Sequence, residues 1–190
     1  MYLSKRAGTA NINAMSQYNP DEVELTRYPA SVLGRAARPV EQIDDGIRAL
    51  VDRMADIMIA NKGVGLAGPQ AGVGLRIFII SLTGTKKDVR AYINPTVTPT
   101  SDDFDANEEG CLSIPGVYTK VRRYRTCSVT ATDLDGRQFT EDADGLYARA
   151  LQHEYDHIEG MTIADRMGAT ARIAHRRQLK KLQKEYEDQA

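Results

Sequence analysis

The sequence predicts an α+β fold in which antiparallel strands pack around a central helix, with an N-terminal amphipathic helix and a C-terminal helix. Apolar residues recur at helical spacing over residues 41–62, and short apolar or alternating runs fill the middle of the chain. Two further helical segments follow these runs. Strands that are gathered between helices, rather than alternating with them one by one, are typical of α+β domains.

The first helix is expected over residues 41–62, where apolar side chains recur mostly at steps of three and four. Gly63 is expected to end this helix in the left-handed conformation that glycine adopts most easily. An irregular, glycine-rich loop is expected to follow as far as Gly74. The apolar positions of the helix are Ile43, Ile47, Leu50, Val51, Met54, Ile57 and Met58.

Short strands are expected in the middle of the chain. Residues 75–82 are apolar and rich in β-branched side chains, which predicts a strand buried on both faces. A second strand is expected over residues 89–94, closed by Pro95. After a polar stretch, alternating segments and an Asp135-Gly136 turn predict several antiparallel strands. These strands are expected over residues 117–124, 127–133 and 137–141.

Two helices are expected in the last third of the chain. Asp144 is expected to cap a helix over residues 145–159, which Gly160 ends. A last helix is expected over residues 169–187, with an apolar stripe that packs against the domain. The stripe consists of Leu179, Leu182 and Tyr186.

Length, charge and cysteine content exclude several classes of protein. The 190 residues correspond to one domain, and 25 basic against 26 acidic side chains give a net charge of −1. No field of the whole molecule therefore draws it to DNA or to an anionic membrane. The longest apolar run, Ile77 to Ile80, is far short of a membrane span, and two cysteines do not form a disulfide framework. These features predict a soluble protein of the reducing cytoplasm.

The motif His153-Glu154-Tyr155-Asp156-His157 lies in the helix expected over residues 145–159. Residues four apart share a helix face, so His153 and His157 point two imidazoles at one metal ion. Glu154 can reach a water bound to that ion. The alternative is that both histidines are polar surface residues. We favour the metal centre, which makes the central helix of the fold a metal-binding helix.

A third metal ligand is expected upstream of this helix. A catalytic metal usually takes three protein ligands, and the position of the third histidine in the metalloprotease pattern is occupied by Ile163. Downstream carboxylates are few and unpersuasive. Cys111 lies in a glycine-flanked turn and can offer a thiolate. The alternative, a buried small hydrophobic residue, is retained for Cys127.

The glycine-rich loop can supply a donor to an oxyanion. Gln70 carries a neutral amide, which donates a hydrogen bond without competing for the metal. A glutamine that faces solvent is the alternative. Nucleotide binding is discounted, because the loop lacks both the Lys-Ser/Thr ending of a phosphate loop and the dinucleotide glycine spacing.

Three motifs in this order make the chain resemble the peptide deformylases. They are GVGLAGPQ from Gly63 to Gln70, EGCLS from Glu109 to Ser113, and QHEYDH from Gln152 to His157. The resemblance extends over residues 22–175. Many members of the family have alanine where this chain has Gly68, a change that is expected to loosen the loop that positions Gln70.

The resemblance also implies roles for individual residues. Cys111, His153 and His157 would bind the metal, and Glu154 would carry the proton. Gln70 and the backbone amide of Leu112 would hold the oxyanion. The implied substrate contacts are the backbones of Val64, Gly65 and Gly110, and a methionine pocket that includes Val64, Leu146 and the stem of Arg149. Tyr118 stands where some bacterial members carry an arginine, so that contact to the substrate backbone is absent or comes from Arg123.

The function that the resemblance implies is a metal-dependent hydrolase. It would remove the N-formyl group from the N-terminal methionine of newly synthesised peptides and release formate. One divalent ion per chain is implied, Fe²⁺ in the native enzyme, with Zn²⁺ or another first-row metal as alternatives. Two other readings stay open: a general metallopeptidase, and a structural zinc module that docks on RNA or the ribosome.

The expected domain organisation has three parts. Residues 1–19 are expected to form a flexible N-terminal extension, with a targeting segment as the alternative. Residues 20–168 are expected to form the catalytic metallohydrolase domain, and residues 169–190 a C-terminal helix of the same domain. No membrane or DNA partner is expected. Weak contact with the ribosome is expected through basic residues of the last helix. These residues are Arg176, Arg177, Lys180 and Lys181.

Overall fold

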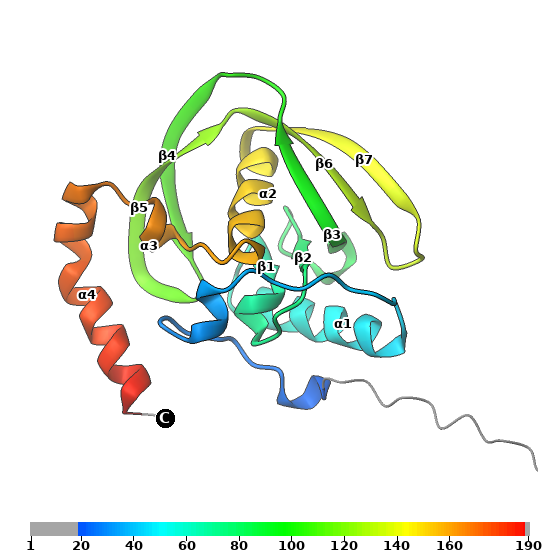
Figure 1. Cartoon of the computed structure of the whole chain (residues 1–190), viewed down its shortest axis with the longest axis horizontal. Coiled ribbons are helices and arrows are strands. Elements are labelled where there is room, and N and C mark those ends of the chain that lie inside the picture. The colour runs from blue at the N-terminus through cyan, green and yellow to red at the C-terminus, as the bar shows by residue number, and fades with distance from the viewer. Residues whose placement is uncertain (1–18, 189–190) are drawn as a thin grey trace, which may run out of the picture.

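The computed structural model describes residues 19–188 and contains helices and antiparallel sheets, as the sequence predicts (Figure 1). The strands are β1 (Gly65–Ala67), β2 (Ile77–Ile80), β3 (Arg90–Pro99), β4 (Phe104–Cys111), β5 (Ile114–Tyr124), β6 (Thr126–Thr132) and β7 (Gln138–Asp144). The α-helices are α1 (Asp45–Ala60), α2 (Gly145–Ile158), α3 (Ile163–Arg166) and α4 (Ala169–Glu187). Short 3₁₀ helices lie at Pro20–Glu22, Ser31–Gly34, Gly68–Ala71 and Lys86–Asp88.

Helix α2 lies between two sheets. Five strands form one antiparallel sheet in the order β1-β2-β3-β6-β7, while β4 and β5 form a separate two-stranded sheet. In Figure 1, β4 and β5 pass on one side of α2, and β6 and β7 on the other. Helix α1 packs below β1 and β2, and α4 lies at the outer edge beside β5. The two sheets therefore bring distant parts of the chain to opposite sides of α2.

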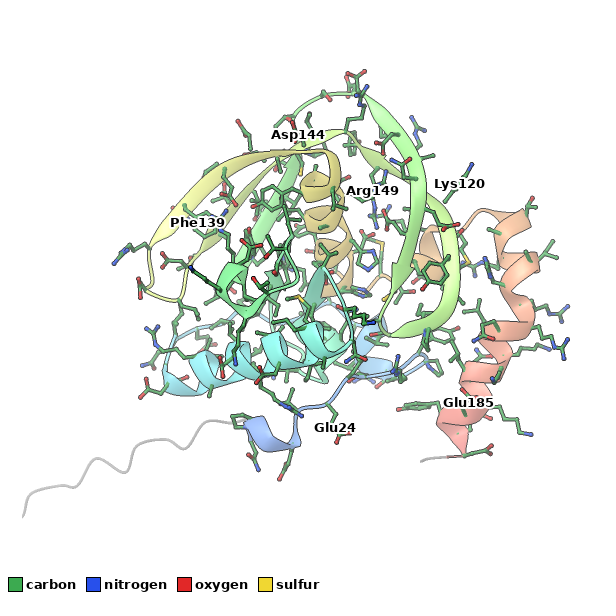
Figure 2. All side chains as sticks on the ribbon, turned by 180° about the vertical axis from the view of Figure 1, so that it is seen from behind. Glu24, Lys120, Phe139, Asp144, Arg149 and Glu185 are labelled. Atoms are coloured by element: carbon green, nitrogen blue, oxygen red, sulfur yellow. The ribbon has the colours of Figure 1, made fainter. Side chains whose placement is uncertain are left out.

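Three apolar clusters fill the interior, and Figure 2 shows the side chains between the elements. The first joins α1 to β2, and the second joins α2 to the five-stranded sheet. The third lies under α3 and α4, where Leu182 is 6% exposed and Leu179 is partly buried. Tyr186, the last residue of the expected stripe, is 38% exposed, so only part of that stripe is covered.

The first helix begins later than the sequence predicts. Asp44 caps α1, since its carboxylate accepts a hydrogen bond from the Ile47 N–H at 2.9 Å. Just before the cap, Asn94 of β3 bonds both the N–H and the carbonyl of Val40, each at 2.8 Å. These two bonds engage the backbone groups of Val40, the residue just before the predicted helix. The prediction of a helix from residue 41 is wrong because a distant side chain and a cap decide where it begins.

The end of α1 also differs from the prediction. The left-handed residue is Lys62, with φ of 56°, and not Gly63. Glycine is needed at position 63 for a different reason: a Cβ there would lie 2.7 Å from the Leu112 side chain. Gly63 therefore allows the turn that carries Leu112 to approach the end of α1.

Several strand boundaries were mispredicted. Strand β3 continues through Pro95 to Pro99, because a register shift between Ile93 and Thr96 removes Pro95 from the ladder and Asn94 adopts φ of 50°. Strand β1 lies within the loop that was expected to be irregular, and β4 begins within the stretch that was read as a polar connection. The hairpin turn between β6 and β7 is confirmed, with Gly136 at φ of 80°.

The two long C-terminal helices agree with the prediction. Helix α2 ends before Gly160, which has φ of 77°, and α4 spans the expected residues. Asp144 occupies the N-cap position of α2, but its side chain makes no capping hydrogen bond, so that detail of the prediction is wrong. Among residues 19–188, no helix is both long enough and apolar enough to span a membrane. The expected extension over residues 1–19 lies, except for Asn19, outside the described part of the chain.

Candidate active site

Helix α2 and the end of β4 bring together the three residues that the sequence singled out as metal ligands. His153 and His157 lie one turn apart on α2, and Cys111 is the last residue of β4. Potential ligand atoms of Cys111, His153 and His157 all lie within 4.8 Å of one another. The Cys111 sulfur is 3.3 Å from Nε2 of His157. The packing of β4 against α2 thus brings Cys111 beside two histidines that lie more than forty residues later in the sequence.

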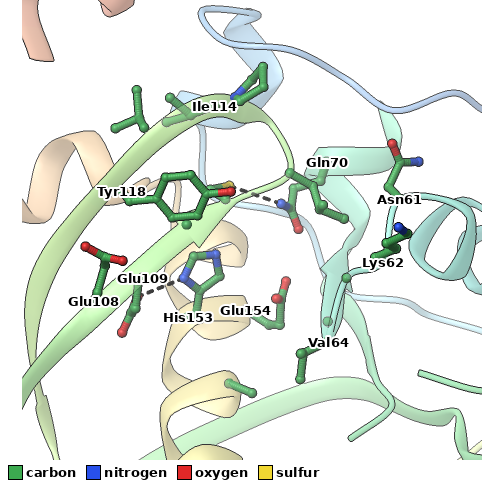
Figure 3. A pocket seen from close by; sticks show the side chains of 18 of the residues that line it. Asn61, Lys62, Val64, Gln70, Glu108, Glu109, Ile114, Tyr118, His153 and Glu154 are labelled. Atoms are coloured by element: carbon green, nitrogen blue, oxygen red, sulfur yellow. Dashed lines mark hydrogen bonds and ion pairs between the residues drawn. The ribbon is translucent and has the colours of Figure 1, made fainter. Parts of the chain in front are cut away.

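A pocket of about 640 Å³ opens onto this cluster. Its walls come from several parts of the chain: Arg27, the segment from the end of α1 to β1, Gln70, β4 and β5 with the turn between them, and α2. Figure 3 shows Gln70, His153 and Glu154 around the same space, with Val64 and Tyr118 on opposite sides of it. Among the described residues, this pocket is therefore the natural location for a substrate.

Glu109 fixes the orientation of His153. Nδ1 of His153 lies 3.0 Å from the Glu109 carboxylate, which also accepts hydrogen bonds from Arg123 and Arg149. Burial by itself would raise the pKa of Glu109, but bonds from His153 and Arg123 outweigh it and hold the pKa at about 2. Because Glu109 is ionised, Nδ1 of His153 is the donor, which leaves Nε2 as the ring nitrogen that can bind a metal.

The chemistry of the three side chains fits a divalent metal. Burial would raise the pKa of the Cys111 thiol, but His157 and His153 beside it place the pKa well below its ordinary value. A thiolate with two imidazoles is a common ligand set for first-row metals. Oε2 of Glu154 is buried beside the cluster without a hydrogen-bond partner, as expected for a polar atom that faces a site for a further group.

Glu154 is buried beside the cluster, with 4% of its surface exposed. Burial raises the pKa of its carboxyl to about 7, although His153 and His157 oppose the shift. Gly65 of β1 packs directly on this side chain: a Cβ at position 65 would overlap the carboxylate and lie 2.8 Å from Cγ of Glu154. The absence of a side chain at Gly65 therefore gives the Glu154 carboxyl the space that it occupies.

The amide of Gln70 is aimed at the cluster. Its Oε1 accepts a hydrogen bond from the Ala67 N–H at 2.8 Å, so Oε1 is the end of the amide that faces the backbone. The opposite end, Nε2, lies 3.4 Å from the Cys111 sulfur. Gln70 is 1% exposed, which excludes the alternative of a glutamine that faces solvent. Leu112 follows Cys111 and lines the same pocket.

Gly68 lies in close contact with the backbone that follows this loop. It is buried, and a Cβ would lie 2.7 Å from the Leu75 carbonyl oxygen and 2.9 Å from that of Val73. The backbone of Val73 and Leu75 therefore packs directly against Gly68. An alanine at position 68 would require these two carbonyl groups to shift, and the effect of Gly68 on the rigidity of the loop stays a prediction.

The five predicted substrate contacts, Val64, Gly65, Gly110, Leu146 and Arg149, all line the pocket. Val64 and Leu146 are exposed, which suits apolar walls. Gly65 belongs to β1, an edge strand, and Gly110 lies in β4 on the opposite wall. The guanidinium of Arg149 is bound to Glu109 and Asp105, so only its stem is available to a ligand.

Arg123 does not supply the substrate contact that was considered for it. Its side chain is 4% exposed and is bound to Glu109 at 2.9 Å and Asp156 at 2.5 Å. Burial would lower the pKa of its guanidinium, but the two carboxylates outweigh that effect and raise it. Tyr118 lies over Gly110, whose Cβ would come within 2.7 Å of the ring. Tyr118 itself therefore lines the pocket.

Sequence reasoning missed the buried charges around His153. Arg123 shares the inward face of β5 with Val117, Thr119 and Val121, because buried residues alternate along that strand. That alternation was a usable signal, since a buried arginine requires carboxylate partners. The partners themselves, Glu109 on β4 and Asp156 on α2, come from other elements and are not indicated by local spacing.

Comparison with known proteins gives one consistent result. The family model described as polypeptide deformylase matches residues 23–172. A peptide deformylase of Pseudomonas aeruginosa is 39% identical over 168 residues, covering 88% of this chain and 98% of the relative. One of Treponema pallidum is 41% identical over 145 residues, covering 76% and 88%.

Solved structures agree with the sequence matches. A plant peptide deformylase superposes with a TM-score of 0.87 at 32% identity, covering 92% of this chain and 95% of that one. A peptide deformylase of Legionella pneumophila gives a TM-score of 0.80 at 37% identity, covering 87% and 97%. Both the fold and the sequence are thus similar along almost the whole described chain.

Proposed function

The chain belongs to the peptide deformylase family, and from that premise we propose how its own residues perform the reaction. The protein is an enzyme that removes the N-formyl group from newly synthesised peptides. The observation that carries the residue assignment is the convergence of Cys111, His153 and His157, of which Cys111 and His153 line one pocket. The family is metal-dependent, and these three residues would hold the ion. The fold's central helix is then its metal-binding helix.

A bound divalent ion supplies a Lewis acid that brings the pKa of water toward neutrality. Around it, Glu154 is the residue that moves the proton. Its Oε2 is buried without a partner, so this atom can take the proton of the attacking water and return it to the departing amine. Glu109 keeps His153 in the tautomer that leaves Nε2 for the ion.

Two donors of the chain would hold the oxyanion that forms on the substrate. Nε2 of Gln70 points toward Cys111, because Ala67 fixes the other end of the amide. The N–H of Leu112, next to Cys111, is the second donor. Both belong to segments that pack closely, so little reorganisation is needed during the reaction.

The substrate would lie as an extended chain between β1 and β4. Gly65 at the open edge of β1, the N–H of Val64 just before it and Gly110 offer backbone groups for strand-like pairing, while the Val64 carbonyl already accepts a hydrogen bond from the Ser81 N–H at 2.8 Å. Leu146 and the stem of Arg149 would contact the methionine side chain. Because the formyl carbon carries only hydrogen, a site narrowed where Gly65 packs against Glu154 would admit the formyl group and exclude an acetyl group or an internal peptide bond.

The test is formate release from a formyl-methionyl peptide by anaerobically purified, Fe²⁺-loaded protein. We expect release by the natural chain and none above background with Glu154→Ala, provided that both proteins carry the same amount of metal. Gln70→Ala should retain the metal and lower kcat by about 10²- to 10³-fold, the usual effect of removing one oxyanion donor. A Gln70→Ala enzyme with unchanged kcat would remove Gln70 from the mechanism.

The same assay addresses the two alternative functions. A general metallopeptidase would also cleave acetylated peptides or internal peptide bonds, so cleavage of a matched N-acetyl peptide would contradict the steric argument. A structural zinc module would release no formate although folded and loaded with metal.

We propose Fe²⁺ as the native ion, with Zn²⁺ as the alternative. A single thiolate with two imidazoles accommodates both, and the loaded metal depends partly on supply. Metal analysis after anaerobic purification tests the identity. If the ion is Fe²⁺, exposure to air should lower activity, because oxygen attacks the iron and its thiolate ligand. Zinc as the main metal in protein from unsupplemented cells would contradict the assignment.

Helix α4 would give the enzyme weak contact with the ribosome, where its substrate emerges in the cytoplasm. The four basic residues Arg176, Arg177, Lys180 and Lys181 are exposed on this helix. Co-sedimentation with ribosomes should weaken as salt rises. It should also be lost when these four residues are changed to glutamine, and be kept when Arg35, Arg48, Lys87 and Arg137 are changed instead. Salt-independent sedimentation, or none, would exclude the contact.

A further inference from the structure

The two loops that would hold the oxyanion are joined by a third segment. Residues 26–28, here called the bridging segment, belong to no helix or strand. The Thr26 N–H donates to the carbonyl of Gln70 at 2.7 Å, and the Tyr28 N–H donates to the carbonyl of Ser113 at 3.0 Å. One short stretch of backbone therefore bonds to both loops, which lie more than forty residues apart in the sequence.

Arg27, between these two backbone donors, adds a third bond. Its guanidinium donates to the carbonyl of Leu112 at 2.5 Å. Bonds from an ionised donor are shorter and stronger than bonds between neutral groups. The carbonyls of Leu112 and Ser113 are consecutive, so Arg27 and Tyr28 together hold two successive peptide units of the turn that begins at Cys111.

The other end of the bridging segment is held just as closely. Gly72 has φ of 75°, and a Cβ there would lie 3.2 Å from Oγ1 of Thr26. The turn that follows Gln70 therefore packs against Thr26 without an intervening side chain. Since the Gln70 amide is in turn fixed by Ala67, the backbone position of Gln70 determines where its Nε2 lies.

We propose that the bridging segment sets the distance between the two oxyanion donors, and that Arg27 is the positioning residue that holds the Leu112 donor in place. The inference rests on the proposed roles of Gln70 and the Leu112 N–H. Arg27 acts through the Leu112 turn and not on the metal, and none of the three metal-ligand side chains bonds to it. Small displacements matter here, because about 1 Å of misplacement can cost on the order of 10²-fold in rate.

Arg27 is also exposed and lines the pocket, so direct binding of the substrate is the competing role. The two roles affect different constants. Loss of a positioning contact lowers kcat with little effect on KM, whereas loss of a uniform substrate contact raises KM and leaves kcat unchanged.

The experiment compares Arg27→Met, Arg27→Lys and Arg53→Met with the natural chain, all as Fe²⁺-loaded enzyme. Arg53 is the matched control, because its Nε donates to the carbonyl of Val23 at 3.0 Å and so anchors the same N-terminal stretch away from the oxyanion loops. We expect Arg27→Met to lower kcat about tenfold, with KM within twofold and metal content unchanged. Arg27→Lys should restore part of kcat, and Arg53→Met should leave it within twofold.

Amide hydrogen exchange provides a readout independent of turnover. A peptide that covers residues 110–114 should exchange faster in Arg27→Met than in Arg53→Met, since only the first variant releases the Leu112 carbonyl. A rise in KM at constant kcat, or equal kcat loss in both methionine variants, would overturn the positioning role.

Gln70→Ala, measured in parallel, separates failure of the inference from failure of the proposed function. If Gln70→Ala is slow and Arg27→Met is not, the oxyanion donors stand and the positioning role falls. If Gln70→Ala has the natural kcat, the oxyanion assignment itself falls, and the inference falls with it.

Discussion

Helix α2 presents two faces of opposite chemistry, and the contrast explains how the site is held. Toward the five-stranded sheet, Ala148, Leu151 and Ile158 are fully buried in an apolar cluster. Toward β4 and β5, Arg149 and Asp156 are buried as charges and bonded to ions on the two-stranded sheet. The apolar face stabilises the fold by burying side chains, whereas the charged face fixes the orientation of its side chains through ion pairs.

Each face has one cysteine beside it, and the two thiols differ accordingly. Cys127 packs in the apolar cluster, where burial and the nearby Asp142 raise the pKa of its thiol to about 11. At the charged face, the two histidines lower the pKa of Cys111 despite its burial. The same residue type is an inert core side chain on one side of α2 and a metal ligand, as proposed, on the other. The surroundings decide the role.

The largest effect is expected from breaking the charged face with Arg123→Met. This change leaves Glu109 and Asp156 buried with one partner fewer each. Removing one partner of a buried ion pair typically costs about 3–5 kcal/mol of unfolding free energy. Urea unfolding measures the loss. The exposed pair of Arg137 with Asp135 gives the control Arg137→Met, expected to cost less than about 1 kcal/mol. Equal losses would show that the charged face contributes no more than the surface does.

Breaking the apolar face should cost stability but spare catalysis. Leu151 is fully buried, and Leu151→Ala should lower the unfolding free energy by about 3 kcal/mol, since a cavity adds to the lost burial. Turnover per folded molecule should stay within about threefold, because the ion pairs that orient His153 are untouched. Leu82→Ala, at a side chain that is 46% exposed, is the control. A large fall in kcat would mean that the two faces are not independent.

Local pattern predicts most of the elements but not their ends. Helical spacing located α1, the Asp144 and Gly160 signals located α2, and Asp135-Gly136 located the β6–β7 hairpin, because all these signals reside in the local sequence. Asn94 clamping Val40 is a contact between residues 54 apart, and no local rule indicates it.

The candidate site shows the same difference between features that local sequence predicts and features that depend on distant contacts. The sequence alone suggested one site for His153, His157 and Cys111, because each lies in a short motif of residue types that bind metals. The structure places their potential ligand atoms close together. The bond that Nδ1 of His153 donates to Glu109, however, depends on how β4 packs against α2. Residues that orient the reactive groups come from packing, which explains why they were missed.

Gly65→Ala changes the position where β1 packs against Glu154 of α2. The added Cβ overlaps the Glu154 carboxylate, so this side chain must move. We expect kcat to fall on the order of 10²-fold, equivalent to about 2.7 kcal/mol in the barrier, with metal content unchanged. Gly34→Ala, at a position with no atom within 4 Å of the new Cβ, is the matched control. If both variants keep the natural kcat, the position of Glu154 tolerates displacement.

The smallest effect is expected on the pH dependence of stability, through Cys127 at the apolar face of α2. Its folded pKa of about 11 exceeds the ordinary value of 9.0, so the folded state holds the thiol proton more tightly than the unfolded state does. This contribution to stability is complete below pH 9.0 and is lost as the pH rises toward about 11. Between these limits the unfolding free energy of the natural chain should fall by on the order of 1 kcal/mol more than that of Cys127→Ala. Burial also raises the pKa of Tyr92 and Tyr147, but both tyrosines are common to the two proteins, so their contribution cancels in the difference. Parallel curves would mean that the thiol of Cys127 reaches water as readily in the folded state as in the unfolded one.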